Sequence, residues 1–323
     1  MDSLDVGILR ELSRDQILWF GRLDPRISAA EISRRLRVDR ATVGARLHDW
    51  ERSGFLRGHE VVPSPLVFNA RIAGGNLRVT DLRKKPEVLN DLTLIPGLIS
   101  AVDHVGDWIA LLYAYEEPRA LERSRKLLER LPGVGEATPC VPFHPPEPTV
   151  VPTALDFRIL DDLKSNPRRN LQQIAKSVRI SSKSLVRRLT QLVQGRAIWY
   201  LPILDFTRYR KSIVARFVVA LKAGGDASGV ATAARQLVPN MTYLVDTTSL
   251  SGPGVGIPSM LDLSAHLDSL GQVEDVQLTL QNLESVESVE VLFPRRFYLY
   301  REWFDEHIRT AVGRHQGKSV REA

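Results

Sequence analysis

The strongest constraint on this 323-residue chain is a motif that occurs twice, over residues 30–47 and again over 172–189. Each copy predicts a short apolar-faced helix, a three-residue turn and a second helix that opens on an N-cap residue. This is the helix-turn-helix arrangement, which presents its second helix to the DNA major groove. Four apolar pairs lie 142 positions apart: Ile32 and Ile174, Val38 and Ile180, Val43 and Leu185, Leu47 and Leu189.

Each copy is preceded by a similar helix. The spacing i, i+4, i+5, i+8 of its apolar residues marks one face of an α-helix. The offset here is 151, which indicates a nine-residue insertion in the first copy, around residues 17–24. The matched residues are Leu4, Ile8, Leu9 and Leu12 in the first copy and Leu155, Ile159, Leu160 and Leu163 in the second.

Three helices and a strand are therefore expected at the start of each half. Asp39 and Ser181 suit the N-cap of the third helix, and Gly54 and Gly195 suit its end. The expected helices and strand span 4–20, 28–36, 40–52 and 55–62 in the first half, and 156–164, 171–178, 182–194 and 198–204 in the second.

A βαββαβ rhythm follows in each half, with a tight turn at Gly106-Asp107 in the first half and a turn over 251–254 in the second. The first half predicts strands over 70–79, 98–105, 108–115 and 134–143 and helices over 82–94 and 118–131. The second predicts strands over 212–221, 241–248, 256–263 and 285–293, helices over 227–237 and 269–283, and a terminal helix over 297–312.

This order predicts an α+β chain with two winged helix-turn-helix modules and two ferredoxin-like βαββαβ sensing modules. Six prolines within residues 139–152 indicate a linker that forms neither helix nor central strand. The expected parts are helix-turn-helix module 1 (1–64), sensing module 1 (65–145), a proline-rich linker (146–154), helix-turn-helix module 2 (155–210), sensing module 2 (211–295) and a C-terminal helix and tail (296–323).

Composition excludes several classes of protein. The chain is 43% hydrophobic and 25% charged, which is ordinary for a globular protein. It lacks an apolar run of about 18 residues and a secretory pattern at its start, so neither a membrane span nor export is expected. Cys140 is the single cysteine, which predicts a reducing compartment. Cys140 and His144 are too few for structural zinc, and no metal or cofactor is expected.

Positive charge is concentrated on the second motif. Residues 155–211 hold 13 Lys and Arg against 4 Asp and Glu, whereas residues 1–60 hold 11 against 10. Phosphate contacts require such an excess. Predicted base-edge contacts in the second copy are Ser182, Lys183, Ser184 and Arg187, with Arg188 on phosphate. Arg40, Thr42, Ala45 and Arg46 are the candidates in the first copy, which could instead be retained for packing and dimer geometry.

On these motifs the chain resembles two fused copies of the Lrp/AsnC family of transcription regulators. The helix-turn-helix phrase, the Leu-Asp start of helix one (Leu4-Asp5 and Leu155-Asp156) and the Gly106-Asp107 turn carry the resemblance, over about residues 2–294. The second copy departs from the Gly-Asp turn with Gly252-Pro253-Gly254, and Gly44 lies in the middle of helix three of the first copy, where glycine costs about 1 kcal/mol.

The resemblance implies a sequence-specific, non-enzymatic transcription regulator that acts as an intrachain pseudo-dimer on double-stranded DNA. The strands over 55–62 and 198–204 should then pair. A small effector, such as an amino acid, would bind near Asp103, Gly106 and Asp107. The alternative is that Gly106-Asp107 forms an ordinary hairpin turn, which needs no ligand. A homodimer or higher oligomer, without a membrane partner, is expected in the bacterial cytoplasm at the nucleoid.

Two other functions fit the same fold. Fused double modules also occur in siroheme decarboxylases, whose tetrapyrrole chemistry would need His and Arg near a large pocket, and His104 is the candidate there. A protein-interaction scaffold with a vestigial helix-turn-helix is the third alternative. The aromatic stretch 297–304 fits either a partner surface or packing within the chain.

Overall fold

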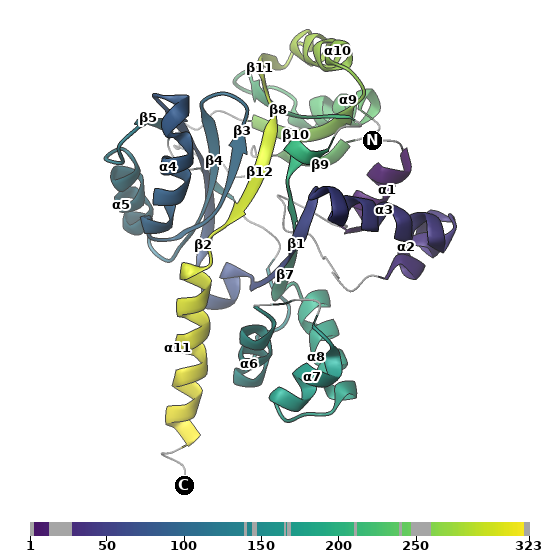
Figure 1. Cartoon of the computed structure of the whole chain (residues 1–323). Coiled ribbons are helices and arrows are strands. Elements are labelled where there is room, and N and C mark those ends of the chain that lie inside the picture. Colours follow the sequence, from purple (N-terminus) through teal and green to yellow (C-terminus); the bar gives the residue numbers. More distant parts are fainter. Residues whose placement is uncertain are drawn as a thin grey trace.

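In the computed structural model, each half of the chain begins with three helices and a strand (Figure 1). The structure describes residues 3–12, 28–138, 141–143, 147–164, 166, 169–209, 212–238, 241–246 and 260–319. The first set consists of α1 (Ser3–Leu12), α2 (Ala29–Leu36), α3 (Arg40–Ser53) and β1 (Leu56–Pro63). The second consists of α6 (Ala154–Leu163), α7 (Leu171–Ser177), α8 (Ser182–Gln194) and β7 (Ile198–Leu204).

The predicted N-caps of α3 and α8 are confirmed. The Asp39 carboxylate accepts hydrogen bonds from the backbone N–H groups of Ala41 (2.7 Å) and Thr42 (3.2 Å), and the Ser181 hydroxyl accepts one from Ser184 (3.1 Å). These bonds satisfy backbone donors that have no partner inside the helix. Gly54 ends α3 with φ 76°, a left-handed conformation that favours glycine. The remainder of the predicted first helix, and the insertion, lie outside the described residues.

β1 and β7 form a two-stranded antiparallel sheet, as expected, with a register from Leu56 opposite Leu204 to Pro63 opposite Ile198. Apolar side chains from both helical sets and both strands share one core, which also includes Ile308 near the C-terminus. Helices of both sets pack against the β1–β7 ribbon. The ribbon and the shared core therefore join the two sets into one unit. In Figure 1 the first set lies to the right of the ribbon and the second below it.

The first half continues into a sheet with the order β12-β3-β4-β2-β5, in which β12 is Pro294–Leu299 from the second half, and β6 pairs with β2 at the edge. Pro142 lies in β6, at an edge where a missing N–H is tolerated. In Figure 1, α4 and α5 lie together beside this sheet. Its elements are η1 (Pro65–Phe68), β2 (Arg71–Val79), η2 (Leu82–Lys84), α4 (Lys85–Asp91), η3 (Leu92–Leu94), β3 (Leu98–His104), β4 (Trp108–Tyr115), α5 (Pro118–Leu128), β5 (Val134–Ala137) and β6 (Val141–Phe143).

The second half contains a four-stranded sheet with the order β11-β8-β10-β9 and its own apolar core. The predicted turn over 251–254 and the first residues of the strand expected from 256 lie outside the described residues; β10 is described from Met260. The elements are η4 (Phe206–Arg208), β8 (Ile213–Leu221), α9 (Ala227–Leu237), β9 (Met241–Asp246), β10 (Met260–Leu267), α10 (Leu270–Gln281) and β11 (Val286–Leu292).

The predicted terminal helix over 297–312 is wrong in its first part. Residues Pro294–Leu299 form a strand, β12, which pairs antiparallel with β3 of the first half. Aromatic and branched residues suit a half-buried strand, and the edge of β3 offers unpaired backbone groups. The end of the chain therefore completes the sheet of the first half, and the last helix, α11 (Glu302–Ser319), starts later than expected.

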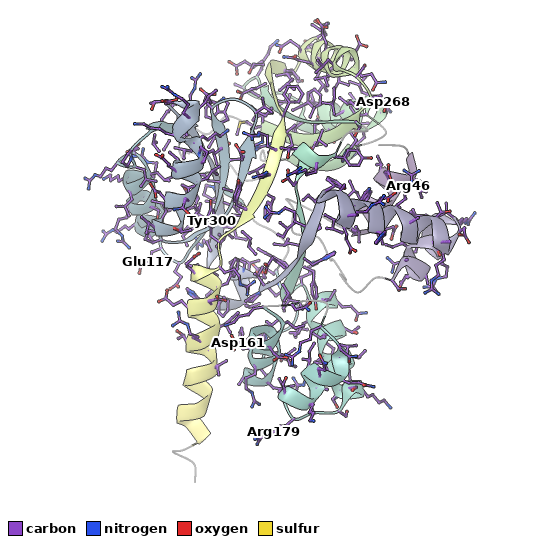
Figure 2. The ribbon with its side chains drawn as sticks, in the orientation of Figure 1. Arg46, Glu117, Asp161, Arg179, Asp268 and Tyr300 are labelled. Carbon is purple, nitrogen blue, oxygen red and sulfur yellow. The ribbon has the colours of Figure 1, made fainter. Side chains whose placement is uncertain are left out.

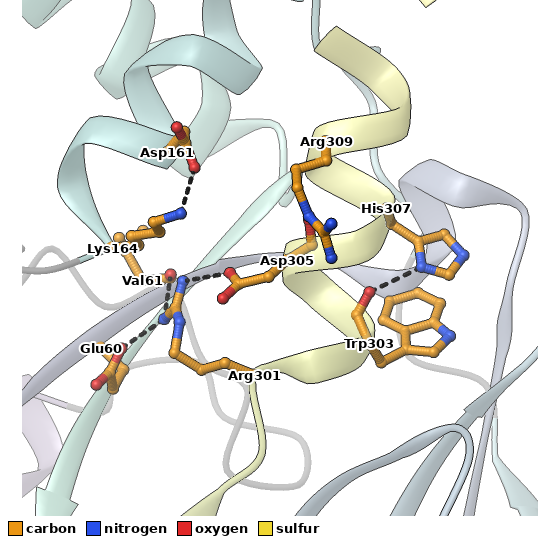
Figure 3. Close-up of polar contacts among 9 residues, drawn as sticks. All are labelled: Glu60, Val61, Asp161, Lys164, Arg301, Trp303, Asp305, His307 and Arg309. Atoms are coloured by element: carbon orange, nitrogen blue, oxygen red, sulfur yellow. Dashed lines mark hydrogen bonds and ion pairs between the residues drawn. The ribbon is translucent and has the colours of Figure 1, made fainter. Parts of the chain in front are cut away.

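The start of α11 is anchored by polar and aromatic contacts (Figure 3). The Arg301 guanidinium donates to Glu60 (2.6 Å) and to the Val61 carbonyl oxygen (3.4 Å) in β1. The His307 ring stacks on Trp303, with 3.9 Å between ring centroids, and its Nδ1 lies 2.8 Å from the Trp303 carbonyl oxygen. Since α11 also packs along α6, it connects the first sheet to the second helical set. Within the described residues, none of the helices is long and apolar enough to cross a membrane.

Candidate nucleic-acid interface and the buried polar junction

The exposed face of α8 is basic. Lys183 and Arg187 are exposed, whereas Ser182 and Ser184 are half-buried and the Ser184 hydroxyl lies 3.0 Å from the Ser181 hydroxyl. Lys183 and Arg187 lie four positions apart, one above the other on a helix surface. The structure thus places both predicted cations on one outward face, free of acidic side chains between Ser181 and Gln194.

Arg188 points elsewhere. Its Nη1 lies 2.9 Å from Oδ1 of Asp156 in α6, whose side chain is 6% exposed, and 3.3 Å from the Thr153 hydroxyl. The same carboxylate closes a capping box with Thr153 at the start of α6. Arg188 therefore fastens α8 to α6, and this ion pair occupies part of its donor set.

The corresponding pair exists in the first set. Both oxygens of Asp5, which is fully buried in α1, lie 3.2 Å from Nη1 of Arg46 in α3, and the Tyr209 hydroxyl donates to the same carboxylate at 2.8 Å. Arg46 thus lies within the helical set rather than at its tip (Figure 2). The remaining candidates of α3, Arg40, Thr42 and Ala45, are exposed.

Replacing Arg46 with alanine is expected to lower the free energy of unfolding by about 2 kcal/mol, because the buried Asp5 carboxylate loses its charged donor. The matched control is Arg52→Ala, which breaks a pair exposed at both ends with Asp49 and should change stability little. Urea unfolding followed by circular dichroism measures both. Equal stability of the two variants would contradict a structural role for Arg46.

The three predicted effector residues are not gathered at one pocket. Asp103 is buried and lines a pocket of about 490 Å³ between α4 and β12, together with Arg295 and Tyr298. Gly106 forms the hairpin turn with φ 83°, and Asp107 pairs at the surface with Arg78 at 2.6 Å. Neither Gly106 nor Asp107 lines that pocket.

Asp103 belongs to a buried polar junction whose other members include Lys85 and Arg216, which were not among the predicted site residues. The Lys85 ammonium lies 2.7 Å from Oδ1 of Asp103 and donates to the carbonyl oxygens of His104 (2.6 Å) and Gly106 (2.7 Å). Both charged side chains are 4% exposed. Burial lowers the pKa of Lys85, although its pairing with Asp103 opposes this shift. Arg295 of β12 lies 3.5 Å from the second oxygen of Asp103, so two cations share one carboxylate.

His104 connects this polar junction to the second sheet through a contact with Arg216. Nη1 of Arg216 in β8 lies 3.4 Å from its Nε2, and Arg216 is held by Asp262 in β10 through contacts of 2.6–3.1 Å. The His104 side chain is fully buried, and burial, followed by the charges of Arg216 and Lys85, lowers its pKa to about 2. The imidazole is therefore neutral, so its Nε2 can accept from the guanidinium.

The neutral state of His104 predicts a loss of stability in mild acid. Its folded pKa lies below the ordinary value of 6.5, so the unfolded chain binds the proton first. The contribution is complete above about pH 6.5 and falls by about 1.4 kcal/mol per pH unit below it, roughly 2 kcal/mol by pH 5. Urea unfolding at pH 7 and pH 5 should show this loss, and His104→Gln should reduce it. The control is His48→Gln, which changes an exposed histidine and should show the same loss of stability at pH 5 as the natural chain. An unchanged pH dependence of stability in His104→Gln would contradict this account.

Comparison with known proteins gives two findings of different extent. Residues 1–49 match the AsnC-type helix-turn-helix domain. Among solved structures, the siroheme decarboxylase NirDL covers 97% of this chain and 99% of its own at 13% identity and TM-score 0.54, and its complex with an iron-uroporphyrin III analogue covers 96% and 99% at 15% identity and TM-score 0.52. AsnC of E. coli covers 47% of this chain and 99% of its own, at 18% identity and TM-score 0.32. None of the curated proteins matches the sequence.

The prediction that the chain is not an enzyme is contradicted by this comparison, because two solved structures that match 96–97% of the chain are those of an enzyme. At such identity the likeness establishes the fold alone. The match over residues 1–49 agrees with the predicted helix-turn-helix, DNA binding and transcription regulation. The chain thus carries an AsnC-type helix-turn-helix domain at its N-terminus, within a mixed α+β fold shared with a siroheme decarboxylase.

Proposed function

We propose that this chain is a DNA-binding transcription regulator of the Lrp/AsnC type, built from two fused copies and acting as an intrachain pseudo-dimer. The observation that carries the proposal is the outward pair Lys183 and Arg187 on α8, within a helical set that has the same element order and the same buried Asp–Arg pair as residues 3–53. One chain would then offer two recognition helices, α3 and α8, on either side of the β1–β7 ribbon.

Two unlike recognition helices predict an operator with two unlike half-sites. Helices that enter successive major grooves on one side of the duplex must lie about 34 Å apart. Lys183 and Arg187 would contact base edges or phosphates of one half-site, and Arg40, Thr42 and Ala45 those of the other. The ion pairs of Arg46 and Arg188 would set the angle of each recognition helix within its set.

The proposed effector site is the pocket between α4 and β12. A ligand there would contact β12, which leads directly into α11, and α11 packs against α6 of the second helical set. Effector binding could therefore change DNA affinity only through a difference in affinity for two arrangements of β12 and α11. A small carboxylate ligand, such as an amino acid, could pair with Arg295, which lines this pocket. We also propose that the chains associate further into a homodimer or higher oligomer.

The test is binding to the DNA upstream of its own gene, measured by fluorescence anisotropy over a salt series. Neutralising Z phosphates predicts a log–log slope of about −0.9Z, so four contacts give about −3.6. A scrambled duplex of equal composition should bind at least tenfold more weakly. Equal affinity for the upstream and the scrambled duplex at every salt concentration would refute the proposal that the chain is a sequence-specific regulator.

A tetrapyrrole enzyme is the second candidate, favoured by the contact between the fully buried His104 and the partly buried Arg216 and by the end-to-end fold likeness. His104 lines neither the pocket beside α4 nor the groove of about 650 Å³ beside β1, so a substrate would require the junction to open. Siroheme added under reducing conditions should then shift its visible absorbance and lose the mass of one CO₂ for each carboxylate removed, because a proton takes the place of the carboxylate on the remaining carbon. Siroheme recovered intact, with an unchanged spectrum, would refute this candidate.

A further inference from the structure

The two candidate recognition helices differ in the apolar side chain at one pair of equivalent positions, Val186 in α8 and Gly44 in α3. These two positions lie 142 residues apart, which is the offset between the two copies of the motif. Val186 is 46% exposed and lies outside the buried face of this amphipathic helix, which holds Leu185 and Leu189. The matching position in α3 has no side chain. The repeat thus contains an internal comparison between a protruding apolar group and its absence.

Val186 lies among the side chains that face outward from α8. Lys183, Val186, Arg187 and Thr190 are all exposed, and their spacing i, i+3, i+4, i+7 places them along one helix face. In the major groove, guanine offers acceptors to Arg or Lys, whereas thymine offers a 5-methyl group that only an apolar contact can recognise. A valine beside Arg187 therefore has the chemistry to read thymine next to a base read by the guanidinium.

Gly44 is not explained by packing within the molecule. A Cβ built at this position would meet no heavy atom within 4 Å, and its backbone does not adopt the left-handed conformation that favours glycine. Glycine inside a helix nevertheless costs about 1 kcal/mol relative to alanine. The helix has room for a side chain at this position, and α3 has no apolar group there that could touch a base.

We propose that Val186 reads a thymine 5-methyl group in the half-site bound by α8, and that the half-site bound by α3 lacks this discrimination because Gly44 occupies the equivalent position. The inference rests on the proposed DNA-binding function. It assigns one base pair at which the operator departs from a perfect palindrome.

The test replaces thymine with deoxyuridine, which removes only the 5-methyl group. Duplexes carry thymine at the equivalent base pair of both half-sites, and each thymine is replaced in turn. Replacement in the α8 half-site should raise the Kd of the natural chain roughly fourfold, the ratio that corresponds to burying one methyl-sized group. Replacement at the equivalent thymine of the α3 half-site should leave the Kd unchanged.

Three variants separate reading from folding. Val186→Ala should bind both duplexes with equal affinity, and Gly44→Val should acquire the thymine preference in the α3 half-site. Val151→Ala, which shortens a valine that is 85% exposed outside the recognition helix, is the control and should keep the natural pattern. Circular dichroism confirms that each variant is folded, which is expected because neither Val186→Ala nor Gly44→Val disturbs a packed side chain.

The failures are distinguishable. Selective binding that ignores every thymine-to-deoxyuridine change, or a thymine preference that survives in Val186→Ala, overturns the inference and leaves the DNA-binding proposal in place. Absence of any selective binding by the natural chain overturns both.

Discussion

Replacing Asp103 with alanine is expected to lower the free energy of unfolding by about 3–5 kcal/mol, among the largest effects of any single substitution here. The change leaves the Lys85 ammonium buried, with two carbonyl oxygens but no counter-charge. It also frees Arg295 of β12, so the pairing of this strand with β3 should weaken. Urea unfolding at pH 7 measures the loss.

The matched control for Asp103 is Asp107→Ala in the same hairpin, which removes an equal charge from a surface pair with Arg78 and should change stability little. The double variant Lys85→Met/Asp103→Leu removes both charges and should be more stable than Asp103→Ala, because no unpaired charge remains buried. An Asp103→Ala variant as stable as Asp107→Ala would show that the junction does not support the sheet.

Removing the two outward cations of α8 together, in Lys183→Ala/Arg187→Ala, is expected to raise the Kd for operator DNA about 100-fold at physiological salt. Each cation lost from a base edge or phosphate contributes roughly 1–3 kcal/mol, and the salt slope should become shallower by about 1.8. Stability should change little, because both side chains are exposed. Anisotropy titration at several salt concentrations measures the Kd and the slope together.

The control for that prediction is Arg123→Ala/Arg130→Ala, which removes the same charge from exposed positions in and just after α5. It alters the net charge of the chain equally, so any general electrostatic effect on DNA binding appears in both variants. A Kd that rises equally in both would show that α8 makes no specific contact with DNA.

The elements near the repeated motif could be predicted because each is fixed by local chemistry. Asp39 and Ser181 supply a side-chain acceptor where a helix begins, and Gly54 supplies a left-handed residue where one ends. The prediction that β1 pairs with β7 rested on the resemblance to the Lrp/AsnC family, because neither strand's own sequence specifies its partner. The periodicity of the apolar residues specified which face of each helix is buried.

The contacts that depend on the distant fold could not be read from the sequence. Residues 297–299 suit either a strand or the start of an amphipathic helix, and only the free edge of β3 decides between them. Arg46 looks like any cation of a recognition helix until Asp5 is brought beside it. Lys85 likewise opens an ordinary helix, and its burial follows from pairing with Asp103, a residue on a different element.

Selection of bound duplexes from a random-sequence DNA pool tests the central claim most directly, that one chain reads two unlike half-sites through α3 and α8. The account predicts a bipartite motif with unlike halves whose centres lie about one helical turn, or a multiple of it, apart. In Lys183→Ala/Arg187→Ala only the α8 half should lose its sequence preference. A pool that yields no motif, or a single half-site unchanged in that variant, would contradict the claim.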